Sequence, residues 1–295
     1  MLQYANGTRY NQTFIGDTKA NIIAAIETAL FTTVGWTEPT RTSATDITFQ
    51  SLLDVNQQTT NQIKVRVWDG GGNCVRIRLS NVAGSVVQSD SCYLLPAPSK
   101  QFRIVANQYQ FAVMAVGATS SRGFVLCSAL STPSFLVSSS SLQTCAIIMG
   151  DANSDTDTVT RGSFRTSLSG RHLTGGLLNG FGILNGSGVE WIGGASDQGV
   201  PALVVPQSTE LATLTGNLYH DDSSMITEPL IAWGSPNITY PAKIRSQFWD
   251  MAVATDSFPI DAITTFNSAN WINLTDSNAG SMGSQMTGSV WLRIS

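Results

Sequence analysis

The strongest constraint on the fold is an alternation of apolar and polar residues that recurs from residue 47 onwards. Ile63–Trp68 and Cys74–Leu79 alternate with period two on either side of a glycine-rich stretch, Asp69–Asn73. This pattern is typical of two half-buried strands joined by a tight turn, because successive side chains of a strand point to opposite faces and glycine tolerates positive φ. Similar segments predict strands at residues 47–49, 102–105, 109–113 and 123–127.

Only one segment has convincing helical periodicity. Between Thr18 and Thr33, the apolar residues fall on one face of a helix, with Asp17 available as the N-cap and Gly35 as the stop. One helix followed by many strands predicts a mainly β protein, with antiparallel, sandwich-like sheets and a single N-terminal α-helix.

The chain has 295 residues, more than the roughly 100–200 of an ordinary domain, so we expect two domains. The serine run Ser138–Ser141 is the best candidate boundary. It would separate a helix-plus-β domain, residues 1–137, from a second β-rich domain, residues 142–295. In the second domain we expect long glycine-rich loops, such as Gly175–Gly194. The strands predicted between these loops are residues 145–149, 189–192, 202–205, 229–233, 244–253 and 289–294.

The last of these strands is expected to dock into a sheet, either of its own chain or of a neighbour. Residues 1–16 lack the apolar core of a signal peptide, and no run of 18 apolar residues occurs. We therefore expect a product of the cytoplasm that has no contact with a membrane.

Charged residues make up only 12 % of the chain, about half the usual share. The net charge of −4 and the scatter of the 16 basic residues argue against nucleic acid as a partner. The densest basic stretch alternates on period two and predicts a solvated strand face. It consists of Lys64, Arg66, Arg76 and Arg78. A surface of neutral polar residues repels its own copies weakly, which favours self-association.

Metal and cofactor sites are not predicted. The cysteines Cys74, Cys92, Cys127 and Cys145 form no C-x-x-C pair, so buried free thiols are expected, with two disulfides as the alternative. The acidic stretch Asp151–Thr158 departs from the EF-hand pattern and is interpreted as a polar loop. It is nevertheless the place where a calcium ion would be sought.

No catalytic residue is predicted either. His172 and His220 lie in polar stretches without a nucleophile elbow, and Gly180–Gly186 has no basic residue nearby and is interpreted as a turn-rich loop. A glycosidase pair remains an alternative, because the second half contains many carboxylates. These are Asp197, Glu210, Asp221, Asp222 and Glu228.

Tryptophan could contact sugars, but most of the seven tryptophans lie in apolar strand patterns that predict core or interface packing. This applies to Trp68, Trp233, Trp249 and Trp291. Trp191 and Trp271, which are nearer to loops, are the candidates for sugar contacts.

Four segments together resemble structural proteins of tailed-bacteriophage virions. They cover about a third of the chain and match in pattern without any motif of known activity. The segments are the helix Ile22–Ile26 with Gly35-Trp36, the hairpin Arg66–Val75, Leu94-Leu95-Pro96 with Phe102–Phe111, and Ala242–Asp250.

This resemblance implies a tail, neck or baseplate component, or a fibre adaptor, that lies in the virion in several copies. Its partners would be copies of itself and other virion proteins, and it would not be an enzyme. A β module that binds host-surface glycans through residues 170–225 is the main alternative, and a polysaccharide-degrading enzyme is the third hypothesis.

Overall fold

The computed structural model describes about half of the chain, most of it in the first 131 residues and in the C-terminal strands. The described residues are 4–53, 62–81, 92–94, 96, 98, 101–116, 124–131, 145–150, 159–161, 178–184, 190–192, 202–204, 227–234, 244–254, 261–266, 268–274 and 289–295.

The helix lies where the periodicity predicts it, although its cap is different. Helix α1 (Lys19–Glu27) begins after Thr18, whose side chain accepts a hydrogen bond from the backbone N–H of Asn21. Asp17, the predicted cap, instead accepts from the Asn21 side chain. The helix continues as a π-helical segment, η1 (Thr28–Val34), and ends at Gly35, whose φ of 85° is left-handed. No helix in the described part of the chain is long and apolar enough to cross a bilayer.

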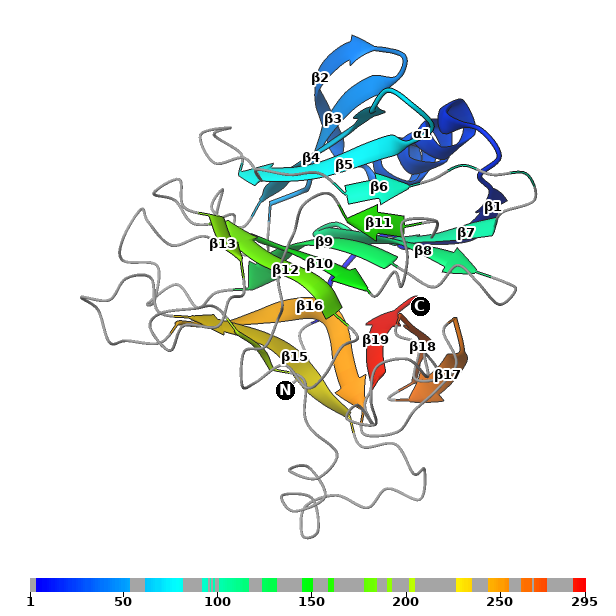
Figure 1. Ribbon diagram of the computed structural model, residues 1–295. Coiled ribbons are helices and arrows are strands. Elements are labelled where there is room, and N and C mark those ends of the chain that lie inside the picture. The colour runs from blue at the N-terminus through cyan, green and yellow to red at the C-terminus, as the bar shows by residue number, and fades with distance from the viewer. Residues whose placement is uncertain are drawn as a thin grey trace, which may run out of the picture.

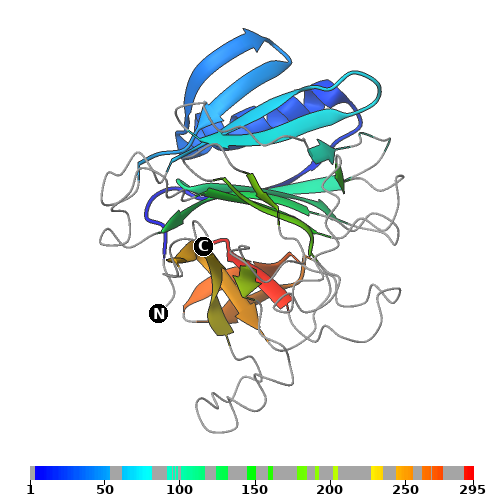
Figure 2. The same ribbon diagram turned by 60° about the vertical axis from the view of Figure 1, so that its left-hand side comes forward.

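A six-stranded antiparallel sheet forms one outer layer of the molecule (Figures 1 and 2). Three of its strands confirm the sequence prediction, including the hairpin of β4 and β5 around the glycine-rich turn. In order across the sheet, the strands are β11 (Val159–Arg161), β6 (Cys92–Leu94), β5 (Val75–Asn81), β4 (Ile63–Asp69), β3 (Asp46–Gln50) and β2 (Thr37–Ser43).

A second, thirteen-stranded antiparallel sheet packs below the first and bends into a lower layer (Figure 2). Its continuous path runs through β1 (Tyr10–Ile15), β7 (Gln101–Ala106), β8 (Gln110–Val116), β9 (Phe124–Ser131), β16 (Ile244–Ala254), β19 (Ser289–Arg293), β18 (Ala269–Asn273) and β17 (Ile263–Phe266). Off this path lie β10 (Cys145–Gly150), β12 (Leu178–Leu184), β13 (Glu190–Ile192), β14 (Ala202–Val204) and β15 (Thr227–Gly234). These sheets confirm a mainly β, antiparallel, sandwich-like fold with one N-terminal α-helix.

One prediction about a single element needs correction. Residues 178–184 were expected within a glycine-rich loop, but they form β12, in which Gly180 and Gly182 lie opposite Met149 and Ile147 of β10. Pairing with β10 on one side and β13 on the other outweighs the low strand propensity of glycine. The C-terminal strand β19 docks into a sheet, as predicted, and of the two alternatives it takes its own chain, where it pairs with β16 and β18.

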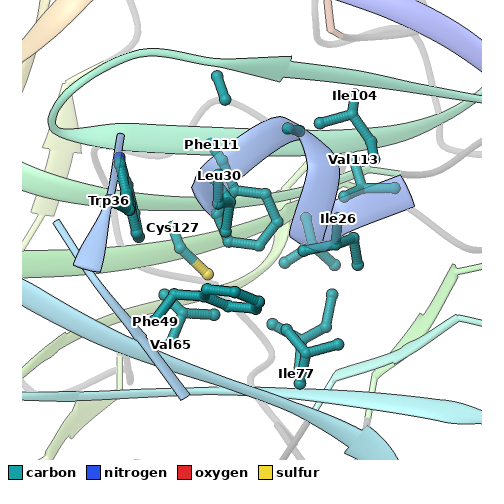
Figure 3. Close-up of a cluster of buried hydrophobic side chains, with 14 of the residues drawn as sticks. Ile26, Leu30, Trp36, Phe49, Val65, Ile77, Ile104, Phe111, Val113 and Cys127 are labelled. Atoms are coloured by element: carbon teal, nitrogen blue, oxygen red, sulfur yellow. The ribbon is translucent and has the colours of Figure 1, made fainter. Parts of the chain in front are cut away.

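The main core lies between the two sheets and is closed at one end by the helix. In Figure 3, Ile26 and Leu30 of the helical segment lie between residues of the two sheets, with Phe111 on one side and Phe49 and Ile77 on the other. Each of these side chains is fully buried. Because the helix contacts strands of both sheets, its apolar face is the third wall of this core.

The predicted domain boundary near Ser138–Ser141 lies outside the described residues. Strands from both sides of it share one hydrogen-bonded sheet, because β9 pairs with β10 and with β16. The division into residues 1–137 and 142–295 stays a prediction.

A buried ion pair joins the N-terminal segment to the C-terminal strands. The carboxylate of Asp250, on β16, is fully buried and accepts hydrogen bonds from the Arg9 guanidinium, the Ala5 backbone N–H and the Asn107 amide. Arg293 lies 3.9 Å away on β19. Burial raises the pKa of Asp250, while Arg9, the N–H of Ala5 and Arg293 act in the opposite direction. Asp250 also has a φ of 50°, which aspartate tolerates better than most residues.

Further hydrogen bonds extend this network across strands β8 and β9 of the thirteen-stranded sheet. The Asn107 carbonyl accepts from the indole N–H of Trp36, and its side chain accepts from the N–H of Tyr109. The Gln110 amide donates to the carbonyl of Trp249 at 2.6 Å, next to Asp250, while its oxygen accepts from the Ser128 hydroxyl. Every one of these polar side chains is buried and satisfied, as a stable interior requires.

Replacing Asp250 with alanine is expected to lower the free energy of unfolding by about 3–5 kcal/mol, because the substitution leaves a largely buried guanidinium without its counter-ion. Urea unfolding monitored by circular dichroism measures this change. The control is Glu38→Gln, which removes an exposed partner of Arg41 and should leave stability almost unchanged. Equal unfolding midpoints for the two variants would contradict the role assigned to Asp250.

Candidate anion-binding surface

The outer face of the six-stranded sheet brings three arginines together around one tryptophan. Residues of β4 and β5 alternate between buried and half-buried, so Arg66, Trp68, Arg76 and Arg78 all lie on the face away from the core. The strand register places Arg66 directly opposite Arg78, and Trp68 opposite Arg76. We call these four residues the arginine–tryptophan cluster.

Two guanidinium groups stack on the indole ring. The guanidinium carbon of Arg66 lies 4.7 Å from the ring centroid of Trp68, and that of Arg78 lies 5.3 Å from it. Both distances fall within the range of cation–π attraction, which is strongest for tryptophan. The indole therefore fixes two positive groups next to each other on an exposed sheet.

Among the described residues, a carboxylate partner is present for Arg66 and not for Arg78. Asp46, on β3, accepts two hydrogen bonds from Arg66 at 2.7 and 2.8 Å, and this interaction raises the pKa of Arg66. Burial, together with repulsion from Arg66 and Arg76, lowers the pKa of Arg78. Like charges directly opposite each other in a sheet are destabilising, so the Arg66–Arg78 pair carries a repulsion that the bonds to Asp46 and the stacking on Trp68 offset.

The turn of the hairpin allows Arg76 to lie close to the backbone. A Cβ atom added to Gly70 would lie 2.5 Å from Cγ of Arg76, so only glycine leaves room for this side chain. The turn itself is held to the helix, because Lys19 donates to Asp69 at 2.7 Å and to the carbonyl of Gly72. The glycines thus position a charged side chain in addition to forming the turn.

The sequence predicted correctly on which face of the sheet the basic residues of β4 and β5 lie, but it did not predict the stacking of two of them on Trp68. Lys64, Arg66, Arg76 and Arg78 were expected on a solvated strand face, and all four are half-buried on the outer face. Trp68 was expected in core or interface packing, and of these the core is excluded, because the side chain lies on the outer face of the sheet. The alternation predicted the face, whereas the stacking depends on the pairing of β4 with β5.

Trp271 was predicted as a sugar contact, and this prediction is wrong. The side chain is fully buried in a small second core of the lower layer, where it stacks on Phe266 with ring centroids 4.3 Å apart. Trp191 lies on β13, opposite Ile183 of β12, and its side chain is outside the described residues. Trp249 and Trp291 are buried, as predicted.

The other candidate residues are mostly outside the described part of the chain. Glu228 lies on β15, opposite Val253 of β16. Cys127 is buried, and Cys74 has a free, half-buried thiol. Among the described residues, no three histidines, cysteines or acidic residues gather into a group that could hold a metal ion. The candidates outside the described residues are Asp151–Thr158, His172, His220, Asp197, Glu210, Asp221 and Asp222.

Comparison with protein-family models and with curated proteins finds no match for this chain. The fold and the arginine–tryptophan cluster are therefore interpreted from their own geometry.

Replacing Arg78 with glutamine is expected to change how stability depends on salt. At low ionic strength, removing the repulsion raises the free energy of unfolding of the variant by about 0.2–1 kcal/mol. Loss of the stacking on Trp68 lowers it and offsets part of this gain. Between about 0.01 M and about 1 M NaCl the Debye length falls from about 30 Å to about 3 Å, so the stability difference should move in favour of the wild type.

Urea unfolding at several salt concentrations measures this difference. Arg41→Gln is the matched control, since Arg41 forms attractive pairs with Glu27 and Glu38. Its stability difference from the wild type should move in the opposite direction with added salt. Parallel salt dependence for the two variants would refute the repulsion assigned to Arg78.

Proposed function

We propose that this protein is a non-enzymatic structural component of a tailed-phage virion, which assembles in several copies through the edge of a β-sheet. The resemblance of the helix, hairpin and Ala242–Asp250 segments to virion proteins supports the class of protein. The main support for self-assembly is a difference between two sheet edges. One edge has features that prevent pairing with another chain, and the other edge lacks them.

Strand β2 is the protected edge, and β3 is its one paired neighbour among the described strands. It contains Pro39, which has no backbone N–H, and Arg41, whose charge is exposed. Its register with β3 also shifts twice, between Thr37 and Thr40 and between Arg41 and Ser43. Prolines, charges and bulges are the devices by which proteins stop edge strands from pairing with other molecules.

Strand β1 is the unprotected edge. Its sequence, Tyr10–Ile15, contains neither a charged residue nor proline, and its six residues pair with β7 in an unbroken register. Within the described part of the chain, β7 is its one paired neighbour. Ile15 at the end of this strand is 56 % exposed, and η1, which packs against β1, exposes 45 % of Phe31.

A regular, uncharged edge with apolar residues at its end is a template for another strand. A second copy of this chain is the partner that fits best, because the low-charge surface repels its own copies weakly. Pairing at this edge would satisfy outward backbone groups of β1 without any change in the fold.

Lysine at Thr13 is expected to convert the assembled protein to monomers of 31.5 kDa, since an edge lysine opposes strand pairing. Size-exclusion chromatography with light scattering, over a range of protein concentrations, measures the mass. Thr40→Lys is the matched control because it places the same residue on an exposed position of the protected edge β2. This control should assemble like the wild type. A wild type that remains monomeric at every concentration, or equal masses for both variants, would overturn assembly through β1.

The virion assignment has a separate test. Mass spectrometry of purified particles of the encoding phage should find the chain among the structural proteins, in several copies per particle. Its absence from the particles would refute the virion assignment, whatever the oligomeric state of the isolated protein.

A further inference from the structure

The arginine–tryptophan cluster has the properties of a ligand site in an otherwise acidic protein. The chain has a net charge of −4, yet Arg66, Arg76 and Arg78 lie on one face of two adjacent strands. Arg66 and Arg78 lie directly opposite each other and repel each other across the two strands. An anion bound between them would remove this repulsion, because guanidinium groups bind phosphate, sulfate and carboxylate through paired N–H donors.

Trp68 has two effects on such a site. Its ring holds the guanidiniums of Arg66 and Arg78 in place, so less side-chain entropy is lost when an anion binds. Asp46 fixes Arg66 further through two hydrogen bonds and leaves Arg78 without a carboxylate among the described residues. The cluster is therefore preorganised on a rigid sheet, with Arg66 still 39 % exposed to an approaching ligand.

Four described carboxylates are already paired within their own chain: Glu27 and Glu38 with Arg41, Asp46 with Arg66, and Asp69 with Lys19. These four are therefore a poor source of the anion in a second copy of the chain. Nucleic acid fits poorly too, because its dense charge requires a longer basic stripe than one hairpin provides.

We propose that the arginine–tryptophan cluster binds an acidic polysaccharide, whose sulfate, phosphate or carboxylate groups are held by Arg66, Arg76 and Arg78. Such a polymer has separated negative groups, which suits a compact group of guanidiniums, and sugar rings that can pack beside an indole. This site is distinct from residues 170–225, where the sequence placed glycan binding.

Isothermal titration calorimetry with dextran sulfate tests the site, with neutral dextran as the uncharged comparison. The double variant Arg76→Gln, Arg78→Gln is expected to bind dextran sulfate at least tenfold more weakly than the wild type. Arg41→Gln, which removes a guanidinium from the same sheet outside the cluster, should change the affinity less than twofold. Neutral dextran should not bind measurably to any of them.

Two further variants complete the design. Arg78→Lys keeps the charge but loses the paired donors, so it should bind with intermediate affinity, and it serves if the double variant fails to fold. Thr13→Lys, which opposes assembly, should bind each single site as the wild type does, which separates this proposal from the one on assembly.

Three outcomes would overturn the proposal. One is equal affinity of the wild type and a folded double variant for dextran sulfate. Another is tighter binding, per negative charge, of double-stranded DNA or polyglutamate than of dextran sulfate, which would assign the cluster to a different class of partner. The third is equal loss of affinity in Arg41→Gln, which would show only a general effect of net charge.

Discussion

The fold depends on one buried carboxylate. Asp250 is paired with Arg9, 241 residues away in sequence, and is hydrogen-bonded to Asn107 in the turn between β7 and β8. Burying an ion pair is costly unless the remaining donors and acceptors are satisfied. Here they are, because the carboxylate accepts hydrogen bonds from the Ala5 N–H, the Arg9 guanidinium and the Asn107 amide of the thirteen-stranded sheet. The network thus specifies how three distant parts of the chain pack together. An apolar contact of equal area would fix their relative positions less specifically, because it has no directional hydrogen bonds.

Local pattern predicted the strands but could not predict this network. The alternation of apolar and polar residues predicted β3, β4 and β5, because buried and half-buried side chains alternate along these strands without interruption. Ile63, Val65 and Val67 are the buried residues of β4. Asp250 lies within a segment whose apolar residues predict a strand, and nothing nearby distinguishes it from an exposed aspartate. Its partner Arg9 precedes the first strand. Contacts across most of the chain length leave no periodic signal in the sequence, and β12 shows the same limit, since its glycines become a strand only beside β10.

More of the arginine–tryptophan cluster than of the Asp250 network could be predicted from the sequence. Alternation placed the arginines on one face, and the glycine-rich turn showed that the two strands are adjacent. What the sequence left open was the register. A turn centred on Gly71 would pair Arg66 with Arg76, whereas a turn centred on Gly72 pairs Arg66 with Arg78, as the structure has it. Either register leaves every side chain on the same face, so burial cannot choose between them. Two hydrogen bonds belong to the register observed: Lys19 donates to the Gly72 carbonyl, and the Gly70 N–H donates to the Cys74 carbonyl.

The location of the C-terminal strand changes the argument for assembly. Because β19 lies between β16 and β18, a ring of copies cannot form by donating it, and the ends of the long sheet path become relevant instead. At the end opposite β1 lies β17, Ile263–Phe266, which is also uncharged and exposes 52 % of Ile263. Pairing of β1 with β1 gives an isologous contact that closes at a dimer. Pairing of β1 with β17 of the next copy is heterologous and leaves a free end at each step, so it can continue until a ring closes. Under the proposed function, a ring of more than two copies around a particle axis fits the second arrangement, and a mass above that of a dimer is the property that separates the two.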